Sequence, residues 1–171
     1  MKDKFILDAC CGGRMFWFDK NHKNTLYVDH RELKKGSLKK TPNFEVKPDK
    51  IMDFRKLDLP DNSFKLVVFD PPHLKSLEQN SWIAAKYGTL NPETWREDIL
   101  KGFNECYRVL EDYGVLIFKW SKSNDNRKKR DVSIAGILKL LPVRPLFGHP
   151  SGSKINTIWM CFMKIPGGKN G

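Results

Sequence analysis

Short apolar runs that end in an acidic residue or a turn recur along this sequence. Each run is as short as a buried β-strand, and longer connecting segments separate one run from the next. This alternation predicts a parallel sheet with crossover connections. The carboxyl ends of parallel strands meet at one edge, where open α/β sheets bind their ligands. The runs cover residues 5–7, 26–28, either 44–46 or 50–52, and 64–69, and the acidic residues that follow them are Asp8, Asp29, Asp53 and Asp70.

The second half of the sequence predicts helices and a final hairpin. Apolar residues recur at three- and four-residue spacing over 92–110, which indicates a helix. Asn91 is expected to be its N-cap and Pro92 its first residue. Further along, the predicted elements are a strand over 115–118, a helix over 132–141 and an antiparallel hairpin of 143–147 with 156–164.

Basic residues outnumber acidic residues in this chain of 171 residues. Lys and Arg number 31 against 20 Asp and Glu, which gives a formal net charge of +11 and a pI of about 9.5. Such an excess favours a polyanionic partner, because each neutralised phosphate releases counterions. A merely solvated basic surface is the alternative reading.

The cysteines and the apolar runs bear on the cellular compartment. The four cysteines have neither zinc-ligand spacing nor a disulfide framework, so we expect reduced thiols and no metal. The first apolar run is too short for a signal peptide, and no stretch approaches the roughly 20 residues that span a bilayer. We therefore expect a cytoplasmic protein that does not interact with membranes.

The loop after the first run is built from small residues. Ala9-Cys10-Cys11-Gly12-Gly13 follows Asp8, and such residues let the backbone pass close to a ligand. The loop lacks a Gly-x-Gly-x-x-Gly pattern, so an ordinary tight turn is the alternative. Roughly 20 residues on, Asp29 ends the second run, where an adenosine ribose finds a carboxylate for its two hydroxyls. Together the loop and Asp29 indicate an adenosyl cofactor.

The first loop, Asp29, the Asp53-Phe54 pair, Asp70-Pro71-Pro72-His73 and the order of elements resemble class I methyltransferases that use S-adenosylmethionine (SAM). The resemblance covers nearly the whole chain. It implies one Rossmann-like domain over residues 1–171, with a mostly parallel seven-stranded sheet and an antiparallel C-terminal hairpin. It also implies SAM as the cofactor, bound by Asp8, Ala9, Cys10, Gly12, Asp29, His30, Asp53 and Phe54. The first loop and Phe-Lys-Trp at 118–120 are also similar to small phage and prophage proteins labelled as methylases, which implies a bacterial or phage-infected cell.

Asp70-Pro71-Pro72-His73 resembles the Asp-Pro-Pro-Tyr or Asn-Pro-Pro-Tyr motif of enzymes that methylate exocyclic amines of adenine or cytosine. Such an amine is conjugated with its ring and is a poor nucleophile. The Asp70 carboxylate and the Pro71 carbonyl can accept its two N–H bonds and turn the lone pair towards the methyl group. His73 replaces an aromatic residue that stacks on a flipped base, and stacking, proton transfer and a structural role all remain open. We take Asp70, Pro71, Pro72 and His73 as the candidate catalytic residues.

Two irregular segments are candidates for substrate contact. The first, over 74–91, carries Trp82 and Tyr87, which either stack on extruded bases or are buried beneath the loop. The second, over 121–131, is either a phosphate-binding loop or a solvated charge run. Its candidate phosphate contacts are Lys122, Arg127, Lys128, Lys129 and Arg130. The aromatic residues at 16–18 are expected in the core of a first helix, with closure of the SAM pocket as the alternative.

The sequence therefore predicts a SAM-dependent methyltransferase of an exocyclic base amine, with DNA preferred over RNA as the partner. Because the chain offers only two loops for target recognition, we expect either weak sequence selectivity or a protein partner that recognises the target. A methyltransferase of an RNA base or a small metabolite is the alternative, since fold does not fix substrate. A catalytically silent module that binds SAM or nucleic acid is the third hypothesis. The sequence leaves the oligomeric state open.

Overall fold

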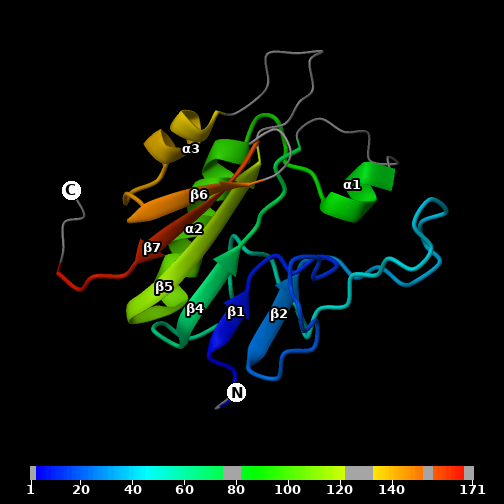
Figure 1. Cartoon of the computed structure of the whole chain (residues 1–171), viewed down its shortest axis with the longest axis horizontal. Helices are drawn as coiled ribbons and strands as arrows, with labels where there is room; N and C mark the ends of the chain where they lie inside the picture. The colour runs from blue at the N-terminus through cyan, green and yellow to red at the C-terminus, as the bar shows by residue number, and fades with distance from the viewer. Residues whose placement is uncertain (1–2, 75–81, 122–132, 152–155, 168–171) are drawn as a thin grey trace.

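A single mixed sheet of seven strands organises the molecule (Figure 1). The computed structural model describes residues 3–74, 82–121, 133–151 and 156–167. The strands are β1 (Ile6–Asp8), β2 (Thr25–Asp29), β3 (Lys50–Ile51), β4 (Phe64–Phe69), β5 (Leu110–Ser121), β6 (Phe147–Ser151) and β7 (Thr157–Met163). They follow the order β3-β2-β1-β4-β5-β7-β6; the first five are parallel, and β7 is antiparallel to both of its neighbours. The expected sheet, mostly parallel with an antiparallel C-terminal hairpin, is confirmed.

The register of the parallel strands brings acidic residues to one edge of the sheet. Asp8 at the end of β1 pairs with Tyr27 of β2 and with Val68 of β4. Two residues further along these neighbouring strands stand Asp29 and Asp70. The three carboxylates therefore gather near the carboxyl edge of the sheet. Asp8 lies two residues further from that edge than Asp29 and Asp70.

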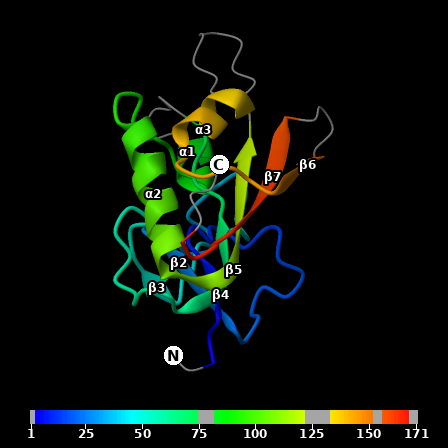
Figure 2. The ribbon, with the colours of Figure 1, turned by 90° about the vertical axis from the view of Figure 1, so that its left-hand side faces the viewer.

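The described part of the chain contains three helices. They are α1 (Trp82–Tyr87), α2 (Trp95–Val109) and α3 (Ile134–Leu140). Figure 2 shows α2 and α3 on the same side of the sheet. Leu116 and Phe118 of β5 and Ile99 and Phe103 of α2 are fully buried in the core between them. Within the described residues, no helix has the length and apolar character needed to cross a membrane.

Helix α2 begins later than the sequence predicted. Its N-cap is Thr94, so the assignment of Asn91 and Pro92 to the cap and first turn is wrong. The Asn91 side chain accepts a hydrogen bond from the backbone N–H of Glu93 (2.8 Å), and the Asn91 carbonyl accepts one from Trp95 N–H (3.0 Å). These bonds make residues 91–94 a turn that leads into the helix. A second difference is α1, a short helix inside the segment expected to be irregular.

Strand boundaries also differ from the prediction. The hairpin strand β6 begins at Phe147, where the predicted strand ended. Pro145 has no N–H to donate to the ladder, and the pairing of β6 with β7 begins two residues later, at Phe147. Pro150 is tolerated because β6 is an edge strand. Of the two candidates for the third run, residues 50–52 contain the observed strand.

The connection between β1 and β2 contains no helix, although every residue in it is described. The expectation of a first helix with three core aromatic residues is therefore wrong. Arg14 has a left-handed backbone (φ 52°), which breaks helical geometry. Trp17 packs edge-on against Tyr27, with ring centroids 5.3 Å apart, whereas the Phe18 side chain is fully exposed. Figure 2 shows this blue segment on the side of the sheet opposite α2.

Gly102 lets α2 approach the sheet closely. A Cβ atom at this position would lie 2.4 Å from Cδ2 of Phe54 and 2.8 Å from Cζ of Phe69. Both rings are buried, and their centroids are 5.4 Å apart, so neither has free space to move into. Because Gly102 has no side chain, Phe54 can pack directly against α2. The sequence predicted that Phe54 binds the cofactor.

Gly102→Ala is expected to lower the free energy of unfolding by roughly 1–3 kcal/mol, because overpacking a rigid core forces side chains to shift. This loss should outweigh the gain of about 1 kcal/mol that alanine brings to a helix interior. Urea unfolding measures the change, and Lys101→Ala at the neighbouring exposed position is the control. A more stable Gly102→Ala protein would contradict the packing argument.

Candidate active site

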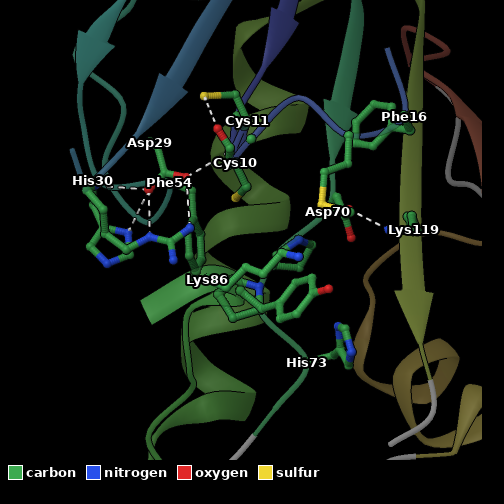
Figure 3. A pocket seen from close by; sticks show the side chains of 18 of the residues that line it. Cys10, Cys11, Phe16, Asp29, His30, Phe54, Asp70, His73, Lys86 and Lys119 are labelled. Atoms are coloured by element: carbon green, nitrogen blue, oxygen red, sulfur yellow. Dashed lines mark hydrogen bonds and ion pairs between the residues drawn. The ribbon is translucent and has the colours of Figure 1, made fainter. Parts of the chain in front are cut away.

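A cavity of about 170 Å³ opens at the carboxyl edge of the sheet (Figure 3). The predicted site residues that line it are Ala9, Cys10, Gly12, Asp29, His30, Phe54, Asp70, Pro71, Pro72, His73 and Tyr87. Residues that follow β1 and β4, Asp29 at the end of β2 and Tyr87 at the end of α1 thus meet around one space. Figure 3 shows Asp29 and His30 at one end of the cavity and Asp70 with Lys119 at the other.

Other predicted residues lie away from the cavity. Asp8 is fully buried and Trp82 lies against Lys40, with the ammonium 5.3 Å from the indole centroid. Asp53 accepts two hydrogen bonds from Arg55 Nε, at 2.9 and 3.0 Å, and this ion pair lowers the pKa of Asp53. The predicted phosphate contacts Lys122, Arg127, Lys128, Lys129 and Arg130 lie outside the described residues.

Asp29 is buried and bound from two sides. The backbone N–H of Gly12 donates to its Oδ2 atom at 3.0 Å, which joins the first loop to the end of β2. Arg31 donates from Nε to Oδ1 (3.0 Å) and from Nη2 to Oδ2 (3.1 Å). The same guanidinium donates from Nη1 to the carbonyl of Ala85 in α1 (3.1 Å). Arg31, which the sequence reasoning missed, therefore ties α1 to the candidate ribose-binding carboxylate.

Asp70 forms an ion pair with Lys119 of β5. The distance from Lys119 Nζ to Asp70 Oδ2 is 2.6 Å, and both side chains are mostly buried. Phe69 of β4 pairs with Phe118 of β5 in the parallel ladder. The residues that follow them, Asp70 and Lys119, therefore lie next to each other. Burial raises the pKa of Asp70, while the charge and hydrogen bond of Lys119 oppose that rise.

Lys119 is itself held in place by aromatic rings. Its ammonium lies 5.7 Å from the centroid of Phe16 and 5.3 Å from that of Trp159. Sequence reasoning missed Lys119, because alternation along β5 places it on the face opposite the buried Phe118 and Trp120, where a lysine is ordinarily solvated.

The turn after β4 is supported by the end of α1. Gly88 has φ of 74°, and a Cβ there would lie 2.8 Å from Cγ of Pro72. The carbonyl of Leu74 accepts hydrogen bonds from Leu90 N–H (2.8 Å) and from the Thr89 hydroxyl (3.1 Å). Nearby, burial lowers the pKa of His73, which favours a neutral imidazole at neutral pH. These contacts place Tyr87 and His73 around the same cavity.

Asp8 is fully buried and directly precedes Ala9 and Cys10, which line the cavity. Trp17 Nε1 donates to its Oδ2 atom at 2.8 Å, and the backbone N–H of Cys10 donates to Oδ1 at 3.3 Å. Burial raises the pKa of Asp8 to about 7, even though both hydrogen bonds favour the ionised form. Among the described residues, no group of three or more His, Cys, Asp or Glu side chains is arranged to hold a metal ion.

Comparison with solved structures identifies the fold. The PH0226 protein from Pyrococcus horikoshii OT3 matches 96% of this chain and 84% of its own, with 16% identity and a TM-score of 0.58. A SAM-dependent methyltransferase from Methanosarcina mazei matches 96% and 94%, with 11% identity and a TM-score of 0.53. The chain has the Rossmann-like fold of SAM-dependent methyltransferases. No protein-family model and no curated protein matches the sequence.

The methyltransferase fold does not fix the reaction. The [4+2]-cyclase SpnF also has it, matching 95% of this chain and 74% of its own at 12% identity, with a TM-score of 0.57. A cyclase and methyltransferases thus share one architecture. The function of this chain must therefore be argued from the residues around its own cavity.

Lys119→Met is expected to raise the pKa of Asp70, because burial still penalises the carboxylate after its nearest cation is lost. Lys119→Arg keeps a positive charge and should leave this pKa close to its original value. Carbon-13 NMR titration of the aspartate carboxyl groups, with Asp70→Asn to assign the signal, measures both. An unchanged pKa in the methionine variant would show that Lys119 does not control Asp70.

Asp8→Asn is expected to change how stability depends on pH. Folded Asp8 keeps its proton up to about pH 7, whereas the unfolded chain releases it near pH 4. The free energy of unfolding should therefore fall as pH rises through this window, by roughly 4 kcal/mol from Asp8. Urea unfolding at several pH values should show a flatter profile for Asp8→Asn, and the exposed Asp58→Asn is the matched control. Parallel profiles for wild type and Asp8→Asn would refute the assignment.

Proposed function

We propose that this chain is a SAM-dependent methyltransferase that acts on an exocyclic amine of adenine or cytosine, preferentially in DNA. One observation carries the proposal. The Asp29 carboxylate at the end of β2 and the Asp70-Pro71-Pro72-His73 turn after β4 line the same cavity. The first suits the ribose of an adenosyl cofactor, and the second suits a base amine.

The residues present fit SAM in their chemistry. Asp29 offers a carboxylate to the ribose hydroxyls, Phe54 offers an apolar ring for the adenine, and the first loop approaches with backbone alone. A Cβ built at Gly12, where φ is 48°, would meet nothing within 4 Å, so there is open space beside the loop. The cavity is smaller than the roughly 300–1,000 Å³ of common ligand pockets. For a bound ribose to reach Asp29, the Arg31 side chain would have to leave that carboxylate.

The acceptor amine is oriented by the turn after β4. Asp70 accepts one of its N–H bonds and the Pro71 carbonyl accepts the other, which turns the nitrogen lone pair towards the cofactor. Bound SAM supplies an electrophilic methyl group on a positively charged sulfur. The ion pair with Lys119 favours the ionised form of Asp70 against the effect of burial and holds its carboxylate in place. After methyl transfer, an Asp70 oxygen receives the proton that leaves the nitrogen.

The neutral His73 ring contributes contact rather than charge. Burial lowers its pKa, so the imidazole presents a flat, uncharged face beside the Asp70 carboxylate at neutral pH. Such a face can stack on a base, as the aromatic residue of the related motif does. Tyr87 lines the same cavity and offers a second ring. The base would then be held between side chains that follow β4 and end α1.

Expression of the protein in a bacterial host is expected to produce methylated adenine or cytosine in DNA, and Asp70→Ala should abolish it. Mass spectrometry of nucleosides from DNA and RNA measures this directly. Calorimetric titration with SAM is the control: Asp70→Ala should keep binding the cofactor, whereas Asp29→Ala should lose at least tenfold in affinity, about 1.4 kcal/mol.

Other outcomes of this experiment would assign a different substrate or activity. Methylation confined to RNA would move the acceptor from DNA to an RNA base. SAM binding with unchanged DNA and RNA would refute a nucleic-acid acceptor and leave a small metabolite. A chain that binds neither SAM nor an acceptor would refute the methyltransferase proposal as a whole.

A further inference from the structure

A second hollow adjoins the candidate active site. This groove, of about 600 Å³, lies between residues 12–21 and residues 35–49. Its lining contains five basic side chains but only two carboxylates, Glu45 and Asp49. Both carboxylates are already paired: Glu45 with Lys35 at 3.6 Å, and Asp49 with Lys4 at 3.1 Å and with Arg14 at 3.4 Å. The groove therefore presents an excess of positive charge.

Arg14 holds the two walls of the groove together. Its Nη1 atom donates to the carbonyl of Lys20 (2.6 Å), and its Nη2 atom donates to the carbonyl of Lys47 (2.7 Å). Its guanidinium also lies 3.7 Å from the ring centroid of Tyr27, and only 14% of its side chain is exposed. Lys20 and Lys47 are thus fixed at the backbone on opposite walls, while their side chains are exposed. Neither forms an ion pair with any other described residue.

The groove leads into the cavity that holds Asp70. The residues that line both spaces are Gly12, Gly13, Met15, Phe44 and Lys86. Phe44 takes its place at this junction because Gly13 has no side chain: a Cβ there would lie 2.5 Å from Cε2 of Phe44. The Lys86 ammonium stands 5.3 Å from the centroid of the Phe44 ring. An aromatic ring and a cation therefore meet where the groove reaches the candidate active site.

We propose that this groove binds the backbone of a single nucleic-acid strand beside the base that enters the Asp70 cavity. Lys20 and Lys47 contact phosphates from opposite walls, and Phe44 stacks on a neighbouring unpaired base. Cationic grooves that follow the backbone, combined with aromatic rings under the bases, are how proteins bind single strands. The inference rests on the proposed function and assigns a surface to its substrate.

The test is fluorescence anisotropy of a labelled 12-nucleotide single-stranded DNA, titrated with the full chain at several salt concentrations. For Lys20→Ala/Lys47→Ala, the slope of log affinity against log salt should become shallower by about 1.4, or about 0.7 for each lost phosphate contact. The matched control is Lys56→Ala/Lys65→Ala, which removes two exposed lysines outside the groove and should leave the slope unchanged. Phe44→Ala should weaken binding at least about fivefold without changing the slope, because stacking carries no charge.

Each other result would overturn the proposal. An unchanged slope in Lys20→Ala/Lys47→Ala, or an equal loss in the control variant, would show that binding does not use the groove. Binding of a duplex but not of the single strand would contradict the choice of ligand. Calorimetry with SAM on the same proteins separates the two proposals: SAM binding without oligonucleotide binding refutes the groove, and the reverse refutes the methyltransferase function.

Discussion

The parallel alignment of β1, β2 and β4 brings three aspartates to one edge of the sheet. Asp8 and Asp29 are buried, and the site depends on how each of the three carboxyl groups is stabilised. Asp29 is held by a guanidinium and Asp70 by an ammonium, so both can keep their charge away from water. Burial raises the pKa of Asp8 to about 7, because its two neutral N–H donors offset only part of the cost of removing the carboxylate from water. The cavity thus has a fixed anion at each end and a buried carboxyl group nearby that favours its neutral form.

Much of this arrangement is local in the sequence and could be predicted. A strand and the acidic residue that ends it are neighbours in the chain, so Asp29 and Asp70 were found without a structure. Lys119 was missed because its ion pair depends on the register between two strands, which joins residues 49 positions apart. Trp17 was misplaced for a different reason. The neighbouring aromatic residues suggested a buried helical face. Instead, the hydrogen bond from the Trp17 indole to Asp8 and the left-handed backbone of Arg14 determine the path of this segment.

The absence of a helix between β1 and β2 shapes both spaces around the site. Parallel sheets are ordinarily covered by helices on both faces, and here residues 9–24 run as turns on the face opposite α2. Because the segment is not wound into a helix, Arg14 can reach the carbonyls of Lys20 and Lys47 and form the wall of the cationic groove. The same path brings Phe16 to Lys119 at the cavity.

Arg31 couples the two ends of the cavity. A ribose at this carboxylate would have to replace the two side-chain bonds from Arg31 to Asp29, and the bond to the Ala85 carbonyl would be lost if the guanidinium moved away. Such an exchange would also affect helix α1. Loss of the bond to the Ala85 carbonyl would remove one contact that holds α1. This helix ends with Lys86 and Tyr87, and Gly88 follows it against Pro72. A ligand that displaced Arg31 from Asp29 would thereby change the contacts of the helix whose end lines the cavity near Asp70, and the binding of cofactor and acceptor would then be coupled.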